Sequence, residues 1–345
     1  MRILHIANYS WFSSSRKRSD DLARYYSTDR KITNGLIRNG HCVWDFSYRD
    51  AARYLSPLWC GKKWGAAKMN ASLLALAKQF LPELILLGHG ELLRPQTLTA
   101  LRDMLPSCKI AQWWVDWFMP HSLSHLRDKQ PHLDAFFATT APSYYRPLLG
   151  DKTAPSYYLP NIVDSSMETE RAFARSQYDY DVFFAGIYVP ERADILRQIE
   201  QLPNIRAGLF GIGDRPLLGG ASLMATIAAS RTGLNLSSAI DIPLYSSARL
   251  AQLTGNGCLV LTPQTPGMTL LFADDEVAYF DSTEELTAQL ARYLRDDAAR
   301  RRVAEAGWKR AHGSYNERRI TQFMIEAIFD VNFSERYEWL GESLV

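Results

Sequence analysis

Long apolar runs and cysteine clusters are both missing from this sequence of 345 residues. No apolar segment approaches the roughly 20 residues of a membrane-spanning helix, so we expect no such helix. The N-terminus has neither the apolar core nor the cleavage site of a signal peptide, and it resembles a first strand. Cys42, Cys60, Cys108 and Cys258 are scattered without metal-type spacing. These absences predict a cytoplasmic protein.

A strong excess of either charge is also missing, because 39 basic residues face 37 acidic ones and leave a net charge of +2. This balance gives no case for a nucleic-acid partner. An Asp-x-Asp motif between apolar strand residues is absent. The pairs Asp20-Asp21 and Asp274-Asp275 are predicted to lie in loops without further ligands, so no metal site and no cofactor are expected.

The chain is too long for one ordinary core, and two α/β domains are the natural expectation. Strand-like and helix-like segments alternate from the start, which predicts mostly parallel sheets covered by helices. Predicted strands cover residues 2–7, 41–46, 83–87, 109–114, 135–139, 180–185, 206–210, 232–236, 258–261 and 277–280. Predicted helices cover 29–39, 69–79, 191–201, 221–229, 245–254, 283–295, 298–312 and 320–331. A turn over 157–161 and a polar segment over 168–178 place the domain junction between the two halves.

The segment from Gly233 to Thr262 is the most informative part of the sequence. A short apolar strand containing Asn235 leads into a serine-rich loop, and a helix is predicted to open near Tyr245 and to end at 255–257. Hydroxyl groups and free backbone N–H groups would gather at the start of that helix, from Tyr245, Ser246 and Ser247, with Arg249 one turn further. Such an arrangement suits a nucleotide diphosphate at a helix N-terminus.

Two residues after predicted strands could act as a general base. Asp116 follows strand 109–114 within a tryptophan-rich segment, whose rings would desolvate the carboxylate and offer a sugar ring a stacking surface. His89 lies between two glycines after strand 83–87, and these glycines allow a ligand to approach the backbone. Either residue could instead be structural, Asp116 as a helix cap and His89 as a core imidazole. Of the two we favour Asp116. His121, His125 and His132 have no metal spacing and are expected at the surface.

A basic and aromatic segment, residues 54–68, contains Trp59, Lys62, Lys63, Trp64 and Lys68, and Arg16-Lys17-Arg18 follows the first strand. Such residues suit a lipid-linked acceptor or an anionic membrane surface. A solvated loop with anchoring tryptophans would have the same composition, so both interpretations stay open.

In its order of motifs the chain resembles the GT-B glycosyltransferases, specifically the bacterial group 1-like enzymes that build surface glycans. The resemblance rests on Asp29–His41, Leu87-Gly88-His89, Leu159–Asp164, Asp181–Gly186, Gly233–Thr262, Ser282–Leu286, Tyr293–Gly307 and His312–Arg318. It implies two facing Rossmann-like domains, an acceptor domain over 1–160 and a donor domain over 161–317. It also implies a C-terminal helix and tail over 318–345 that cross back to the first domain.

The resemblance also assigns further donor-site residues. Arg192, after Gly186, would join Arg249 and the serine hydroxyls in stabilising the leaving phosphate. The loop with Gly211 and Gly213 would border the nucleotide base, although by itself it is a tight turn. A solvated helix arginine is the alternative for Arg192. Many relatives carry a glutamate for the donor ribose where this chain has Gln252, which leaves the donor sugar nucleotide undetermined.

The implied function is transfer of a sugar from a nucleotide-activated donor to a glycan or lipid-linked acceptor, in bacterial lipopolysaccharide or surface polysaccharide synthesis. Enzymes of this fold generally need no bound metal. The chain itself is expected in the cytoplasm, and its basic and aromatic segment would allow it to lie peripherally on the inner membrane. A non-catalytic nucleotide-sugar or glycan-binding protein and a nucleotide-sugar epimerase are the alternatives. A phosphorylase is disfavoured, because residues 181–300 contain no lysine for pyridoxal phosphate.

Overall fold

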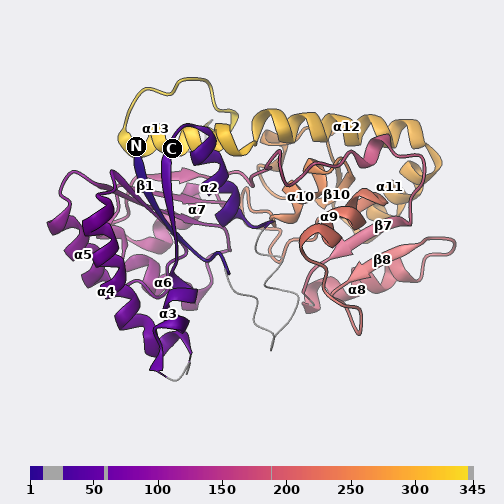
Figure 1. Cartoon of the computed structure of the whole chain (residues 1–345). Helices are drawn as coiled ribbons and strands as arrows, with labels where there is room; N and C mark the ends of the chain where they lie inside the picture. The colour runs from indigo at the N-terminus through magenta and orange to yellow at the C-terminus, as the bar shows by residue number, and fades with distance from the viewer. Residues whose placement is uncertain (11–25, 58–60, 188, 341–345) are drawn as a thin grey trace. The chain divides into compact units, whose positions relative to one another are not determined.

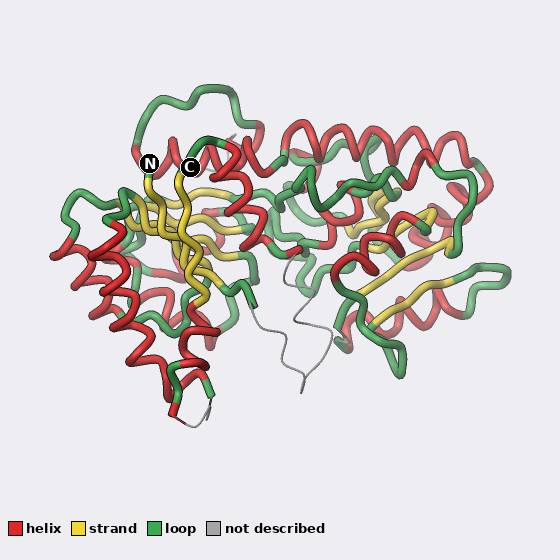
Figure 2. Tube along the Cα trace, in the orientation of Figure 1, coloured by secondary structure: helices red, strands yellow, loops and turns green. Residues whose placement is uncertain are grey.

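The computed structural model describes residues 1–10, 26–57, 61–187 and 189–340. The chain divides into two compact units. Unit 1 contains β1 (Arg2–Ala7), Ser27–Pro160 and the chain from Glu317 onward, and unit 2 contains Asn161–Asn316. Figure 2 shows strands and helices in both units, and every paired strand runs parallel to its neighbours. Within the described ranges, no helix is both long enough and apolar enough to span a bilayer.

Unit 1 is built on a six-stranded sheet of order β2-β1-β3-β4-β5-β6. Its other strands are β2 (Cys42–Ser47), β3 (Leu84–Gly88), β4 (Lys109–Trp114), β5 (Ala135–Ala138) and β6 (Ser156–Tyr158). Its helices are α2 (Thr28–Arg38), α3 (Tyr48–Tyr54), α4 (Lys62–Phe80), α5 (Pro95–Met104), α6 (Pro120–Arg127), α7 (Pro142–Leu149) and α13 (Glu317–Phe329).

The central strands β1, β3 and β4 are buried on both faces because helices cover both. Leu4 and Ile6 of β1 belong to a core shared with α4, whereas His5 between them contacts α2. The same alternation separates the two tryptophans of β4. Trp114 joins the core with α4, and Trp113 contacts His5 on the opposite face.

α13 belongs to unit 1 although it follows unit 2 in the sequence (Figure 1). It packs on α2, where a Cβ added to Gly35 would lie 2.1 Å from the carbonyl oxygen of Glu317. Arg38 of α2 forms an ion pair with the buried Glu317 carboxylate. Phe323 is fully buried, with its ring 6.0 Å from that of Phe137 in β5. The predicted return of the C-terminal helix to the first domain is therefore confirmed.

Unit 2 is built on a five-stranded sheet of order β11-β10-β9-β7-β8. Its strands are β7 (Tyr180–Ala185), β8 (Ala207–Phe210), β9 (Ser230–Leu234), β10 (Leu259–Pro263) and β11 (Ala278–Phe280). Its helices are α8 (Pro190–Glu200), α9 (Gly220–Ala228), α10 (Arg249–Gly255), α11 (Thr283–Arg295) and α12 (Asp297–Ser314). The α/β fold class with two Rossmann-like sheets is thus confirmed.

The structure corrects some predicted elements. The segment predicted as a turn at 157–161 begins as strand β6, which pairs with β5 at the edge of the sheet. The helix predicted from Tyr245 begins only at Arg249 and is seven residues long. α4 begins seven residues before its predicted start, because alanines and lysines extend it beyond the apolar pattern. Helices α3, α5, α6 and α7 were not predicted.

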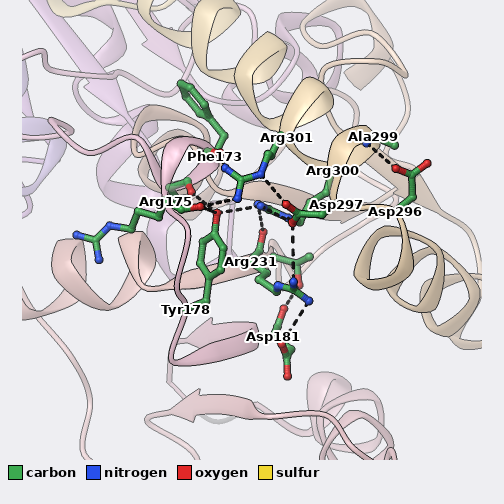
Figure 3. Close-up of polar contacts among 12 residues, drawn as sticks. Phe173, Arg175, Tyr178, Asp181, Arg231, Asp296, Asp297, Ala299, Arg300 and Arg301 are labelled. Atoms are coloured by element: carbon green, nitrogen blue, oxygen red, sulfur yellow. Dashed lines mark hydrogen bonds and ion pairs between the residues drawn. The ribbon is translucent and has the colours of Figure 1, made fainter.

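A charged cluster in unit 2 ties the segment that precedes β7 to the start of α12 (Figure 3). Arg300 of α12 is fully buried, and it donates to the Asp297 carboxylate at 2.8 Å and to the Tyr178 hydroxyl at 2.8 Å. Its guanidinium also lies 4.8 Å from the centre of the Tyr178 ring. Arg301 donates to Asp297 at 2.6 Å and to the carbonyl oxygens of Phe173 and Arg175. The cluster therefore stabilises unit 2.

We predict that Arg300→Met lowers the free energy of unfolding by about 2 to 4 kcal/mol, because it removes the charge-assisted hydrogen bonds that the buried guanidinium donates to Asp297 and to the Tyr178 hydroxyl. The exposed Arg302 on the same helix provides the matched control, and Arg302→Met should change this free energy by less than about 0.5 kcal/mol. Urea unfolding followed by circular dichroism measures both. Equal stability of the two variants would contradict a stabilising role for the cluster.

Candidate functional site

The guanidinium of Arg249 is a buried cation at the carboxyl end of the unit 2 sheet. Arg249 is 9% exposed, and it donates to the carbonyl oxygens of Ala185 at 2.9 Å and Leu236 at 3.2 Å. No carboxylate in the described part of the chain lies within ion-pair distance of it. Burial, aided by the charge of Arg192, lowers the pKa of Arg249 to about 9. A buried charge held only by carbonyl dipoles favours an anion beside it.

Arg192 of α8 brings a second cation to the same place. The Phe184 ring of β7 lies 4.6 Å from the guanidinium carbon of Arg249 and 6.0 Å from that of Arg192. One Arg192 nitrogen also lies 3.5 Å from the Ile187 carbonyl oxygen. Two cations near one aromatic ring repel each other, and an anion between them would remove that repulsion. The structure therefore brings the two predicted arginines together.

Two of the predicted glycines allow other atoms to lie close to the backbone beside this arginine pair. A Cβ added to Gly186 would lie 2.7 Å from a terminal nitrogen of Arg249. Gly211 has a positive φ of 79°, and its added Cβ would lie 2.3 Å from the Gly186 carbonyl oxygen. Gly213 also has a positive φ, of 58°, but its added Cβ would meet no atom within 4 Å. Gly186 and Gly211 thus shape the backbone beside Arg249.

The segment before α10 differs from its prediction. Because α10 begins at Arg249 and is short, Tyr245, Ser246 and Ser247 lie in a loop rather than in a helical turn. The Ser246 hydroxyl accepts from the Asn161 side chain at 2.8 Å. The Ser247 hydroxyl accepts from the Arg249 backbone at 3.4 Å, and the Ser247 N–H donates to Ser237 at 3.0 Å. The prediction that Arg249 lies one turn inside a helix is wrong.

Gln252 and Asn235 occupy different environments. Gln252 is half-buried in α10, and its backbone carbonyl accepts from the Asn256 side chain at 2.8 Å. Asn235 is fully buried just after β9, where its amide donates to the Thr262 hydroxyl at 3.1 Å. Among the described residues, none donates a hydrogen bond to the Asn235 side-chain oxygen. Asn235 therefore links β9 to β10, and its oxygen is a free acceptor.

In unit 1, the structure brings His89 and Asp116 together. His89 Nδ1 lies 3.7 Å from Asp116 Oδ2, and their side chains are 21% and 56% exposed. The imidazole stacks on Trp114 with ring centres 4.3 Å apart and meets Trp113 edge-on at 5.6 Å. The tryptophans thus enclose His89 rather than Asp116, and the predicted desolvation of the Asp116 carboxylate is wrong.

His89 has a strained backbone. Its φ is 58°, and that of Gly90 is 66°. The His89 carbonyl accepts from Gln112 Nε2 at 2.7 Å, and its N–H donates to the Trp113 carbonyl at 3.3 Å. The preceding Gly88 is required, because an added Cβ would lie 2.2 Å from the Trp113 ring. A non-glycine residue held in the left-handed region is more common at functional sites than elsewhere, which supports a role for His89.

A buried hydrogen-bond chain fixes the Trp113 ring beside His89. Since the Trp113 indole can only donate, it donates to Nε2 of His5 at 3.1 Å, and His5 must carry its proton on Nδ1. That proton faces the Tyr9 hydroxyl at 2.6 Å, Tyr9 lies 2.9 Å from the Thr33 hydroxyl, and Thr33 donates to Asp45 at 2.8 Å. Sequence reasoning missed this chain, because an isolated histidine in an apolar strand carries no motif.

A second polar group follows His89. Glu91 accepts from Arg49 at 2.6 Å and from Lys62 at 3.1 Å, and it also contacts the Tyr48 hydroxyl. Burial alone would raise the pKa of Glu91, but the hydrogen bonds from Arg49 and Tyr48 outweigh it and lower the pKa to about 2. Glu91 is therefore a permanent carboxylate near the carboxyl end of β3.

The prediction that His125 lies at the surface is wrong. Its ring packs 5.7 Å from that of Trp114, and its buried Nε2 has no hydrogen-bond partner in the described part of the chain. Burial, together with the charge of Lys129, lowers the pKa of His125 to about 4. Among the described residues, no group of three or more His, Cys, Asp or Glu side chains is placed to hold a metal ion.

The buried His5 predicts an acid-sensitive fold. Complete burial lowers the pKa of His5 to about 4, against the opposing charges of Asp45 and Asp29. The unfolded chain binds this proton near pH 6.5, so stability from the neutral imidazole is complete above pH 6.5 and is lost as the pH falls towards 4.

We expect His5 to contribute about 2 kcal/mol to the loss of unfolding free energy between pH 7 and 5. His5→Gln should reduce that loss, and the exposed His121→Gln should keep it in full. Urea unfolding at the two pH values measures the difference. An unchanged loss in His5→Gln would contradict a lowered His5 pKa in the folded chain.

Comparisons with known proteins agree with this architecture. Residues 192–326 match a family model described as "Glycosyl transferase-like", which covers less than half of the chain. A search of the curated proteins finds no match.

Among solved structures, HepE of Anabaena in complex with UDP is similar at a TM-score of 0.62 and 13% identity, over 96% of this chain and 100% of that one. Sucrose-phosphate synthase of Thermosynechococcus elongatus gives 0.58 and 12%, over 95% and 98%. AviGT4, a glycosyltransferase involved in avilamycin A biosynthesis, gives 0.58 and 12%, over 95% and 97%. The chain therefore has the GT-B fold of glycosyltransferases, and the glycosyl transferase-like region covers most of unit 2 and continues into α13 of unit 1.

Proposed function

We propose that this protein transfers a sugar from a nucleoside-diphosphate donor to a glycan acceptor, and that Arg249 and Arg192 bind the donor diphosphate. The observation that carries the proposal is the buried Arg249 guanidinium, which has carbonyl and aromatic neighbours but no described carboxylate at ion-pair distance. Negative charge builds on the leaving diphosphate during transfer. A desolvated, preoriented cation stabilises that charge more strongly than a cation in water does.

The acceptor hydroxyl must lose a proton, and we propose that His89 and Asp116 act on it as a pair. Asp116 faces Nδ1 of His89, so a small side-chain rotation would make a hydrogen bond that leaves Nε2 as the proton acceptor. The Trp113 and Trp114 rings, which are almost fully buried, would hold the imidazole in place.

The donor and the acceptor can be proposed more specifically from the family resemblance and from the similar solved structures. Because HepE has been crystallised with UDP and with UDP-glucose, UDP sugars are the first donors to test. We propose a glycan or lipid-linked acceptor in bacterial lipopolysaccharide or surface polysaccharide synthesis, at the cytoplasmic side of the inner membrane.

A non-catalytic binding protein is the second candidate, because Gln252 leaves a donor ribose without a carboxylate. Measuring the nucleotide released from a panel of sugar nucleotides distinguishes a glycosyltransferase, which releases it, from a binding protein, which does not.

We predict that Arg249→Ala weakens nucleotide binding by about tenfold or more, since one charge-assisted contact to a phosphate contributes about 1.5 to 3 kcal/mol. Calorimetric titration of UDP and GDP into folded protein measures the affinity. The exposed Arg302→Ala, with the same charge change, should bind like the wild type. Unchanged affinity in folded Arg249→Ala would remove Arg249 from the site.

We predict that Asp116→Asn and His89→Ala each lower turnover by about 10²-fold or more and leave donor affinity unchanged. If the two act as a pair, the double variant should be little slower than the slower single variant. Steady-state sugar transfer and calorimetry measure the two quantities. Near-wild-type turnover in both single variants would place the base elsewhere, or indicate a retaining mechanism.

A further inference from the structure

The chain between Asp50 and Glu83 contains no acidic residue, although it carries five basic ones. Most of this stretch forms α3 and α4, which pack side by side in unit 1 (Figure 1). The inner side of α4 belongs to the core through Met69, Leu73 and Ala77, all fully buried. The outer side of α4 is exposed to solvent. The residue types on that side therefore indicate which kind of binding partner it could contact.

One stripe of that outer side repeats at helical spacing over four turns. It consists of Trp64, Lys68, Ala71, Ala75 and Lys78, all exposed. Residues spaced by three and four positions lie above one another on a helix, so these five side chains share one face. We call this face, together with Lys63 in its first turn, the α4 outer stripe.

The stripe has an uncompensated positive charge. Lys63, Lys68 and Lys78 are exposed, and no acidic side chain in the described part of the chain lies within ion-pair distance of them. Lys62, in contrast, is paired with Glu91 at 3.1 Å. Ordinary surface helices intersperse both signs of charge, so this basic surface favours a partner that is uniformly negative.

Large aromatic side chains lie at the end of the stripe where α3 and α4 are joined. Trp64 is 73% exposed in the first turn of α4, and Tyr54 is 65% exposed at the last residue of α3. Arg53 lies beside Tyr54 and is also exposed, and it is paired with the buried Asp50 carboxylate at 3.3 Å. Tryptophan and tyrosine favour the boundary between lipid head groups and acyl chains, where their rings are buried and their polar atoms stay hydrated.

We propose that the α4 outer stripe, with Tyr54 and Arg53, docks the protein on an anionic phospholipid surface. A second copy of this chain fits the stripe less well, because it would bring Lys68 and Lys78 near their own equivalents. The small alanines between the lysines let the helix approach a flat surface, and each lysine near an anionic leaflet adds attraction that salt screens. The helix itself stays in the fold, because its inner side is part of the core.

This inference goes beyond the proposed sugar transfer and does not depend on it. The sequence predicted a membrane contact for the whole segment 54–68 and for Arg16-Lys17-Arg18. The proposed surface is smaller, because Trp59 and Arg16-Lys17-Arg18 lie outside the described residues and are not part of it. An enzyme with a soluble acceptor and an enzyme with a lipid-linked acceptor would both retain this surface.

The test is co-sedimentation of the full chain with vesicles of phosphatidylcholine alone and with vesicles of equal parts phosphatidylcholine and phosphatidylglycerol. We expect binding only to the second kind, and release by high salt. Lys68→Glu/Lys78→Glu should lower the partition coefficient by about tenfold or more. Lys152→Glu/Lys309→Glu makes the same change in net charge at exposed positions outside the stripe, and it should leave the coefficient unchanged.

Trp64→Ala separates the aromatic from the electrostatic contribution. It changes no charge, so it should weaken binding to anionic vesicles at low salt and leave the salt dependence of the binding unchanged. The proposal is overturned if wild-type protein does not bind anionic vesicles at low salt, or if both double variants lose binding equally. It is also overturned if neutral and anionic vesicles bind the protein equally. Nucleotide affinity of Lys68→Glu/Lys78→Glu should equal that of the wild type, so failure here is distinguishable from failure of the proposed function.

Discussion

Parallel strand pairing is the constraint on which the rest of this structure depends. Because neighbouring strands run in the same direction, the chain must cross over to reach each new strand. The residues that follow the strands of one sheet therefore all lie at the carboxyl end of that sheet. His89 after β3 and Asp116 after β4 meet in this way in unit 1. Arg249 reaches the carbonyls of Ala185, the last residue of β7, and of Leu236 after β9 in unit 2. Residues distant in sequence thus become neighbours by topology alone.

The two candidate sites use buried polar groups in opposite ways. In unit 1, His5, Tyr9 and Thr33 form a hydrogen-bond chain that ends at the Asp45 carboxylate, and each donor in it has an acceptor. Such a chain rigidifies its surroundings. In unit 2, Arg249 has polar neighbours but no described counter-charge, which makes its site a poor contributor to stability and a good receptor for an anion. Arg300 is also buried but is paired with Asp297, so Arg300 and not Arg249 contributes to the stability of the fold.

Strand positions could be predicted well from the sequence, since buried parallel strands are continuous apolar runs bounded by turn residues. Strands β1, β4 and β7 match their predicted bounds. Strand β6 was missed because Pro160 and Asn161 dominate its local pattern, although pairing with β5 decides its conformation. The start of α10 was misplaced because Tyr245 is apolar and buried, as a helix residue would be, yet it lies in a loop. The pairing of His89 with Asp116 could not be predicted, because side-chain distances across a sheet edge have no signal in sequence.

The chain enters unit 2 at Asn161 and leaves it at Asn316, and these two segments are bonded to each other, with the Val163 N–H donating to the Tyr315 carbonyl at 2.9 Å. Unit 2 is therefore complete as a nascent chain once its last residue has left the ribosome. Unit 1 is not complete at that stage, because Gly35 and Phe137 still lack the helix that covers them. Although its strands are synthesised first, unit 1 can close its core only after unit 2 has been made. Order of synthesis and order of completion are thus reversed, and chain interruption after Asn316 would release a finished second unit beside an unfinished first one.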